Sequence, residues 1–213
     1  MKLNVVLVFV LLFAAAAGAQ TDHARTVREW RNMHEWNLKS DDSWFSLAGI
    51  FWLKEGANTV GRGPKFDVQL TSSFKKQKFG TIYLENGNAV LSVENGVEAF
   101  SSGEQISPLP LVSDVEQKQT VIRTGSQSFY LMKRGERFAI RLKDKNNPAL
   151  LSFKGLKWFP IDERFRVTAT FEPFPTPKIL RIPNLLGDTY QMKSEGLLHF
   201  TLDGKKYTLQ PVE

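Results

Sequence analysis

Three histidines are the first side chains to consider, because imidazole serves as a general base and as a metal ligand near neutral pH. His34-Glu35 begins like the H-E-x-x-H motif of zinc metalloproteases, but Leu38 occupies the position of the second histidine. His199 is predicted to point away from the core, where an orienting carboxylate or carbonyl would be needed for it to act as a base. The chain has no cysteine. We therefore expect no metal centre, no cofactor and no thiol nucleophile.

Two pairs of adjacent carboxylates, Asp41-Asp42 and Asp162-Glu163, are the next candidates for acid–base chemistry. Neighbouring residues of an extended chain point in opposite directions, so neither pair forms a glycosidase dyad, whose carboxyl groups face each other. We predict instead that Asp162-Glu163 makes a turn before Arg164. No G-x-S-x-G nucleophile motif is present. The candidates for a catalytic role are His199, Asp162, Glu163 and Arg166.

Aromatic and guanidinium groups are the candidates for ligand binding. Exposed tryptophan faces bind sugar rings or acyl chains, although tryptophans of a β domain more often fill the core. Arginine forks bind carboxylate or phosphate groups. The arginines of residues 137–141 and 164–166 would form one polar sheet face if the two segments pair as strands. The candidate ligand-binding residues are Trp44, Trp52, Trp158, Arg137, Arg141 and Arg164.

The elements that must position these side chains follow from hydrophobic periodicity. Thr26-x-x-Glu29 has the spacing of a capping box, and the apolar residues after it recur at helical intervals, so one N-terminal helix is predicted. Further along, apolar and polar residues alternate as in half-buried strands, for example over 137–143 and 165–171. Two Asn-Gly turns predict a meander of residues 82–84, 88–93 and 97–100. The predicted fold is all-β, an antiparallel sandwich or a partly open barrel, with one N-terminal α-helix.

The first 19 residues have the features of a cleaved signal peptide. Lys2 precedes the apolar run Val5–Ala17, and Ala17-Gly18-Ala19 has the small-x-small form that signal peptidase cuts. The run is shorter than the ~20 residues of a spanning helix. We therefore expect a periplasmic or extracellular protein that begins at Gln20 and has no transmembrane anchor.

The net charge of +6 comes from 28 Lys+Arg against 22 Asp+Glu. The basic residues are scattered along the chain, as is usual for a solvated surface. Nucleic acid is therefore not expected as a partner of an exported chain, and the oligomeric state is left open.

Three phrases resemble the bacterial and archaeal family named domain of unknown function 1684 (DUF1684). They are Leu-Ala-Gly-x-Phe-Trp-Leu within 43–56, the segment 134–144, and Phe-x-Gly-Leu-x-Trp-Phe-Pro within 153–171. The resemblance runs from about Arg25 to the last residue and implies no assigned activity. Members of the family extend further at the C-terminus, so the resemblance implies that the C-terminal part is missing here, either because the chain is a fragment of a longer reading frame or because it is a shortened member.

The expected organisation is a signal peptide over 1–19, a helix and linker over 20–42, and a β-rich domain over 43–213. Because every catalytic motif is incomplete, we expect a non-catalytic ligand-binding or envelope-associated domain. Its partner would be a small molecule or an envelope glycan or lipid. The alternative is a metal-independent hydrolase-like enzyme whose site is completed by the missing C-terminal segment. Whether the protein is an enzyme stays open at this point.

Overall fold

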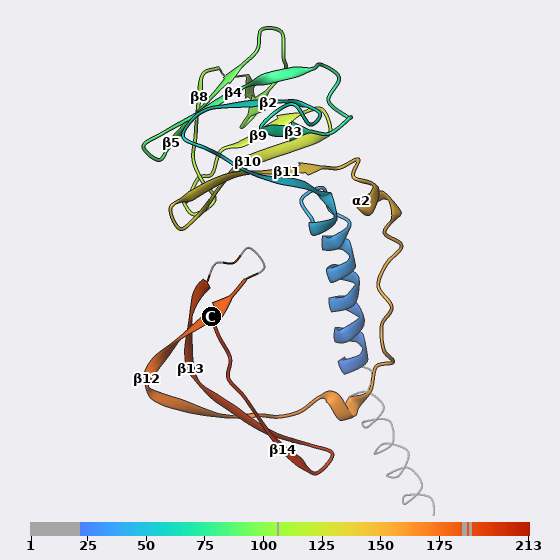
Figure 1. The fold of residues 1–213 in the computed structure, drawn as a ribbon. Helices are drawn as coiled ribbons and strands as arrows, with labels where there is room; N and C mark the ends of the chain where they lie inside the picture. The colour runs from blue at the N-terminus through green and yellow to red at the C-terminus, as the bar shows by residue number, and fades with distance from the viewer. Residues whose placement is uncertain (1–21, 106, 185–186, 188) are drawn as a thin grey trace, which may run out of the picture. The chain divides into compact units, whose positions relative to one another are not determined.

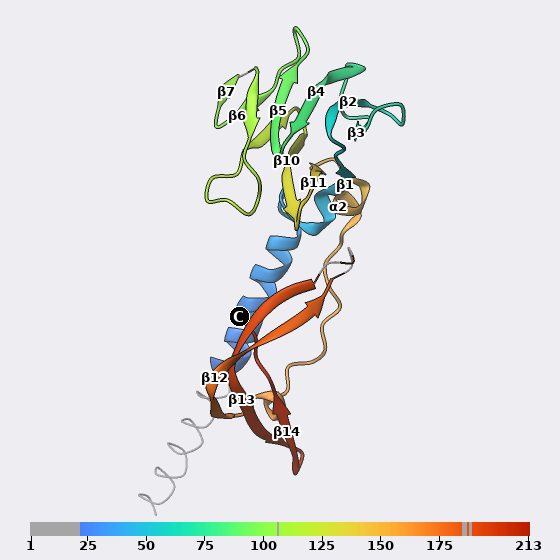
Figure 2. The same cartoon turned by 60° about the vertical axis from the view of Figure 1, so that its left-hand side comes forward.

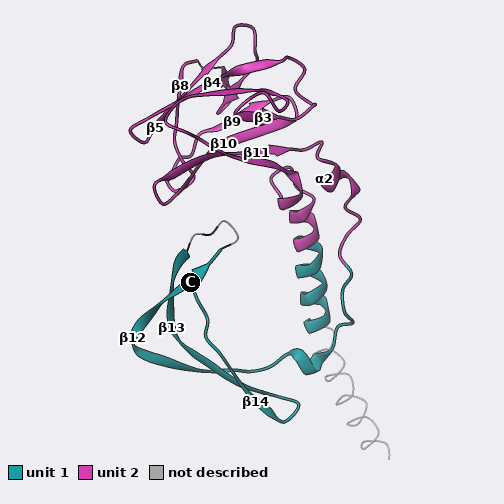
Figure 3. Cartoon of the chain, in the orientation of Figure 1, with its two compact units in different colours: residues 1–33, 157–213 teal, residues 34–156 magenta. Residues whose placement is uncertain are grey.

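The structure is a computed structural model that describes residues 22–105, 107–184, 187 and 189–213 (Figure 1). The predicted signal peptide lies outside the described residues. The chain divides into two compact units, unit 1 with Met1–Met33 and Lys157–Glu213, and unit 2 with His34–Leu156 (Figure 3). The predicted N-terminal helix is confirmed over residues 22–38, which contribute to both units. Within the described residues, no helix has the length and apolar character needed to cross a membrane.

Unit 2 is a β-sandwich of two sheets, which lie face to face in Figure 1. The first sheet has the order β1 (Leu47–Trp52), β11 (Arg137–Asp144), β10 (Gln127–Arg134), β9 (Val121–Thr124), β6 (Phe100–Ser101) and β7 (Glu104–Gln105). The second has the order β3 (Val68–Leu70), β2 (Gly56–Arg62), β4 (Lys78–Glu85), β5 (Asn88–Val93) and β8 (Leu109–Leu111). The β2–β3 pair is parallel, and the other pairs are antiparallel. Unit 2 also contains the 3-10 turn η1 (Trp44–Ser46) and the short helix α2 (Pro148–Ser152). The predicted antiparallel sandwich is therefore confirmed, with one parallel exception.

The core of unit 2 is built from alternate residues of strands in both sheets. Phe79 of β4 is fully buried, and its ring centroid lies 5.4 Å from that of Phe129 in β10 and 5.6 Å from that of Phe74. Aliphatic residues surround these rings. Period-two alternation thus places one side of each strand in the core and leaves the other side for surface chemistry.

The prediction that residues 97–100 form the third strand of a meander is wrong. β5 pairs with β8, whereas Phe100 belongs to β6 and pairs with Arg123 of the other sheet. The backbone N–H of Val97 donates to Glu94, and Gly96 has a φ of +71°. This tight turn directs the chain out of the second sheet before another hairpin strand can form.

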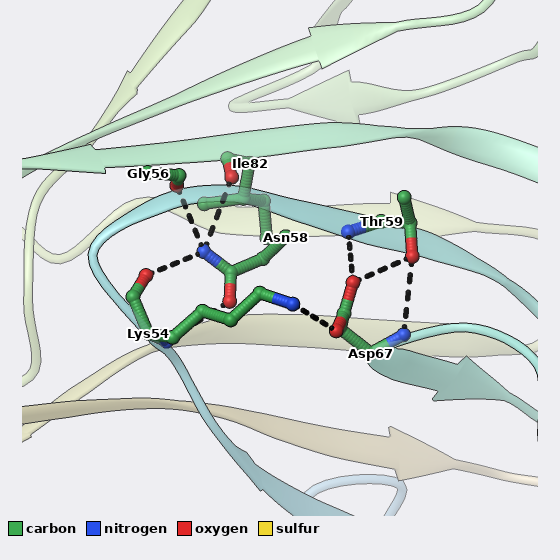
Figure 4. Close-up of polar contacts among 6 residues, drawn as sticks. All are labelled: Lys54, Gly56, Asn58, Thr59, Asp67 and Ile82. Atoms are coloured by element: carbon green, nitrogen blue, oxygen red, sulfur yellow. Dashed lines mark hydrogen bonds and ion pairs between the residues drawn. The ribbon is translucent and has the colours of Figure 1, made fainter.

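A buried amide fixes the connection between β1 and β2 (Figure 4). Asn58 is 1% exposed; its side-chain NH₂ donates to the carbonyls of Lys54 at 2.8 Å and Gly56 at 3.0 Å, and its oxygen accepts from the Lys54 N–H at 3.0 Å. Beside it, the Asp67 carboxylate accepts from Lys54 Nζ at 2.8 Å and from the Thr59 hydroxyl at 2.7 Å. These donors hold the pKa of Asp67 well below its usual range, so the carboxylate stays charged. Residues 54–56 are thereby anchored at the surface.

Unit 1 has an antiparallel three-stranded sheet in the order β12 (Thr170–Pro183), β13 (Thr189–Leu202) and β14 (Lys205–Leu209) (Figures 1 and 2). The strand predicted over 165–171 begins only at Thr170, because the 3-10 turn η2 (Glu163–Phe165) precedes it. Asp162 caps this turn by accepting from the Arg164 N–H at 3.0 Å, which confirms the predicted turn.

Candidate functional site

All five tryptophans of the chain are exposed, from 36% for Trp158 to 71% for Trp36 and Trp44. The expectation that they fill the core is therefore wrong. Along β1 and just beyond it, Phe51 and Leu53 pack against the core of unit 2, and Trp52 between them points outward. The aromatic phrases therefore supply flat apolar area to the surface, where ligands can reach it.

Trp52 lines a cleft of about 680 Å³ in unit 2, at the ends of three chain connections. The β1–β2 connection, the β4–β5 turn and the β10–β11 hairpin form its walls. The Leu53 N–H donates to the Phe138 carbonyl at 2.9 Å, and the Asn86 N–H donates to Glu55 Oε1 at 2.8 Å. These bonds join the walls. The residues that line the cleft are Trp52, Leu53, Glu55, Leu84, Asn86, Gly87, Lys133, Glu136, Arg137 and Phe138.

The Arg137 guanidinium lies 4.2 Å from the centroid of the Trp52 ring in this cleft. The β1–β11 register pairs Trp52 with Ala139, so Arg137, two residues away, lies on the same sheet face. On the same hairpin, Lys133 lies 5.3 Å from the Phe138 ring centroid. Two cations therefore sit against aromatic rings, and two carboxylates, Glu55 and Glu136, complete a lining of mixed charge.

A second Trp–Arg pair occurs outside the cleft. The Arg141 guanidinium lies 4.9 Å from the Trp44 ring centroid, and its Nε is buried without a hydrogen-bond partner. Neither residue lines the cleft of unit 2. This pair has the same chemistry as Trp52 and Arg137 but lies outside that cleft, and it provides a matched control.

The condition for a single face of four arginines, that residues 137–141 and 164–166 pair as strands, is not met. The neighbours of β11 in the sheet are β1 and β10, so residues 164–166 do not pair with it. Arg164 belongs to η2 in unit 1 and forms an ion pair with Asp162 at 2.7 Å. This arginine holds the pKa of Asp162 below its usual value. Arg137 and Arg141 belong to β11 of unit 2, whereas Arg164 and Arg166 belong to unit 1.

In the structure, His199 lies within hydrogen-bonding distance of a carboxylate that its local sequence does not indicate. Its Nε2 lies 2.7 Å from Glu172 Oε2, and its Nδ1 lies 3.0 Å from Thr208 Oγ1. The connectivity is that of a hydroxyl, a base and an orienting carboxylate. However, the side chains of His199 and Glu172 are 39% and 65% exposed, so water competes for both hydrogen bonds.

No sequence motif marks Glu172 and Thr208 as partners of His199, because only the register of three strands brings them to it. The other catalytic candidates do not join this group. The Asp162 carboxylate forms an ion pair with Arg164. Among the described residues, no hydrogen bond or ion pair links Glu163 or Arg166 to His199.

A buried carboxylate, Asp144, is a further candidate for chemistry but is fully engaged by the fold. It accepts hydrogen bonds from the hydroxyls of Thr71 and Ser126 and from the Asn146 N–H at 2.9 Å. Burial alone would raise the pKa of Asp144, but these donors outweigh burial and hold it below the usual value. Ser126 is therefore part of a strand connection that this acid stabilises. In the described part of the chain, no three His, Cys, Asp or Glu side chains are grouped as metal ligands.

Comparison with known proteins gives a family for the C-terminal part of the chain. Residues 151–213 match the model of a family described as "Protein of unknown function (DUF1684)". The resemblance predicted from the sequence is thus confirmed over these residues. Neither the curated proteins nor the solved structures include a match to this chain. The matched residues contain Trp158 and His199, whereas the Trp52–Arg137 cleft lies outside them.

Proposed function

We propose that this protein is an exported binding domain for a carboxylate-bearing sugar of the cell envelope, with the cleft of unit 2 as its site. The observation that carries the proposal is the Trp52–Arg137 pair on the wall of that cleft. The volume of about 680 Å³ falls within the ~300–1,000 Å³ typical of ligand clefts. The face of a tryptophan packs against the C–H groups of a sugar ring. The guanidinium fork of an arginine binds a carboxylate.

The rest of the lining suits hydroxyl-rich ligands. Asn86 offers both an acceptor and a donor, and the Glu136 carboxylate accepts from hydroxyl groups. Lys133 adds a second cation for an acidic substituent, and the excess of basic over acidic residues in the chain attracts anions at longer range. The described lining includes no histidine, serine or threonine. Glu55 already accepts a hydrogen bond from the Asn86 N–H, so Glu55 and Glu136 are not both available as a glycosidase dyad, and we assign binding without turnover to this cleft.

The binding site is tested with two sugars that differ by a single carboxylate. N-acetylmuramic acid is N-acetylglucosamine with a lactyl ether, so the ether adds one carboxylate to the same ring. We expect the GlcNAc–MurNAc disaccharide to bind at least about tenfold more tightly than the GlcNAc dimer, because a charge-assisted hydrogen bond contributes ~1.5–3 kcal/mol. Trp52→Ala and Arg137→Gln should each remove most of this binding in isothermal titration calorimetry.

The matched control for this experiment is Trp44→Ala, which removes the tryptophan of the other Trp–Arg pair. It should leave the affinity unchanged, since Trp44 does not line the cleft. Equal affinity for the two disaccharides, or an equal loss in Trp44→Ala and Trp52→Ala, would contradict the proposed site.

Export is tested at the N-terminus of the secreted protein. Because signal peptidase requires small residues at the −3 and −1 positions, we expect mass spectrometry of the exported protein to find Gln20 as the first residue. Ala19→Phe should block cleavage and leave the precursor uncut. Recovery of an intact N-terminus starting at Met1 from the exported fraction of the unaltered chain would refute the assignment.

A further inference from the structure

A second cleft of about 740 Å³ lies within unit 1, between the N-terminal helix and the segment 159–165. The helix contributes His23, Val27 and Arg31, which are spaced four residues apart and share one helix face. The segment contributes apolar side chains from Phe159 to Phe165. The cleft is thus built by two elements of the same unit.

Aromatic and polar contacts fix the two walls to each other. The Trp158 ring packs edge-on against Trp30, with centroids 5.7 Å apart, and the Arg31 guanidinium lies 5.1 Å from the Trp158 ring centroid. Arg31 Nη2 also donates to the Phe159 carbonyl at 2.9 Å. The segment is therefore held against the helix at the point where the cleft begins.

The cleft has an apolar floor that is open to solvent. Val27, Pro160 and Ile161 lie in it beside two phenylalanines. Phe159 is 88% exposed and Phe165 is 65% exposed. Neighbouring aromatic side chains with such large exposed fractions are typical of a surface that a binding partner covers. A ligand with an extended apolar part would remove both rings from water.

The polar groups of the cleft favour a negative charge. Arg31 and Arg164 carry positive charge, and Asp162 is the one carboxylate of the described lining. That carboxylate already forms the ion pair with Arg164 and caps η2. Arg31 uses one of its five N–H donors for the Phe159 carbonyl, so its fork keeps donors for an anion. The excess positive charge therefore lies at Arg31, with His23 on the same helix face.

We propose that this cleft binds a single-chain amphiphile with an anionic head group, such as a fatty acid. The acyl chain would lie along Val27, Ile161 and Phe165, and the head group would bind Arg31. The site lies in a different unit from the Trp52–Arg137 cleft, and the two proposals are independent. Residues 159–165 also fall within the part of the chain that matches the DUF1684 model.

The test is a series of fatty acids of increasing length, titrated below their micelle concentrations and followed by calorimetry. From octanoate to laurate, affinity should rise about fourfold for each added methylene that is buried, which corresponds to ~0.8 kcal/mol. Decanoate should bind at least about fivefold more tightly than decanol, because a charge-assisted hydrogen bond to Arg31 contributes only to the acid. No dependence on chain length, or equal binding of decanoate and decanol, would overturn the proposal.

Variants locate the site and separate it from the sugar cleft. Phe165→Ser should weaken decanoate binding at least about tenfold, whereas Phe171→Ser, which alters an exposed phenylalanine of β12 outside the cleft, should not. Arg31→Gln should lose the preference for the acid, and Arg31→Lys should restore part of it. Trp52→Ala should leave decanoate binding intact.

The alternative to a fatty-acid ligand is that the exposed aromatic and basic residues bind the surface of a membrane. The protein should bind monomeric decanoate in the absence of vesicles. Sedimentation with vesicles of anionic phospholipid, without any binding of monomeric decanoate, would show association with a bilayer surface and would overturn the proposed cleft.

Discussion

Replacing Phe79 with alanine is expected to lower the free energy of unfolding of unit 2 by ~3–5 kcal/mol. Phe79 is fully buried, and its ring contacts Phe129 of the opposite sheet and Phe74 of the neighbouring loop. The change removes a large apolar surface and leaves a cavity between the two sheets, which the surrounding strands can fill only in part. A loss of this size is a large share of the stability of an ordinary domain.

The control is Tyr83→Ala, on the same strand but with 44% exposure. It should cost less than about 1 kcal/mol, because most surface substitutions change stability little. Urea unfolding of the full chain, followed by hydrogen exchange of β4 and β10 peptides, measures both variants in unit 2 itself. Similar losses in the two variants would show that Phe79 does not join the sheets as described.

Local patterns predicted the strands whose neighbours are close in sequence. The alternation around residues 78–93 and 127–144 was sufficient for β4, β5, β10 and β11, because each hairpin is closed by its own turn. Residues 97–100 and 165–169 show similar patterns and failed. The turn at Gly96 redirects the first segment and η2 precedes the second, and period-two alternation does not carry that information.

The candidate site was predicted as separate residues, not as a site. Side-chain chemistry alone marks Trp52 and Arg137 as candidates, but only the β1–β11 register brings them to one face. Strand alternation indicates the outward position of Trp52, because its neighbours Phe51 and Leu53 lie on the opposite face and pack against the core. The general tendency of tryptophan to be buried concealed this signal.

The partners of His199 show the same limit. Glu172 and Thr208 lie on the flanking strands, and their positions follow from two registers that no local motif specifies. The sequence therefore identified the imidazole but not the groups that orient it.

Replacing Asn58 with alanine is expected to destabilise unit 2 by ~3 kcal/mol, because three hydrogen bonds are lost and each contributes ~1 kcal/mol. The amide satisfies the N–H and carbonyl of Lys54 and the carbonyl of Gly56 (Figure 4). Asn88→Ala is the matched control, since its exposed amide makes one hydrogen bond of 3.4 Å to Asn86. The control should be nearly neutral in the same urea and hydrogen-exchange experiment.

A second substitution separates hydrogen bonding from the loss of volume. Asn58→Asp keeps the size of the side chain but replaces the NH₂ donor with oxygen, which would face the carbonyls of Lys54 and Gly56. We expect Asn58→Asp to destabilise unit 2 at least as much as Asn58→Ala, because a buried charge would be added to the unpaired carbonyls. Both variants should also weaken binding of the muramic-acid disaccharide, since residues 54–56 adjoin the Trp52 wall of the cleft. If Asn58→Asp were as stable as the unaltered protein, the amide would not be the group that holds this connection.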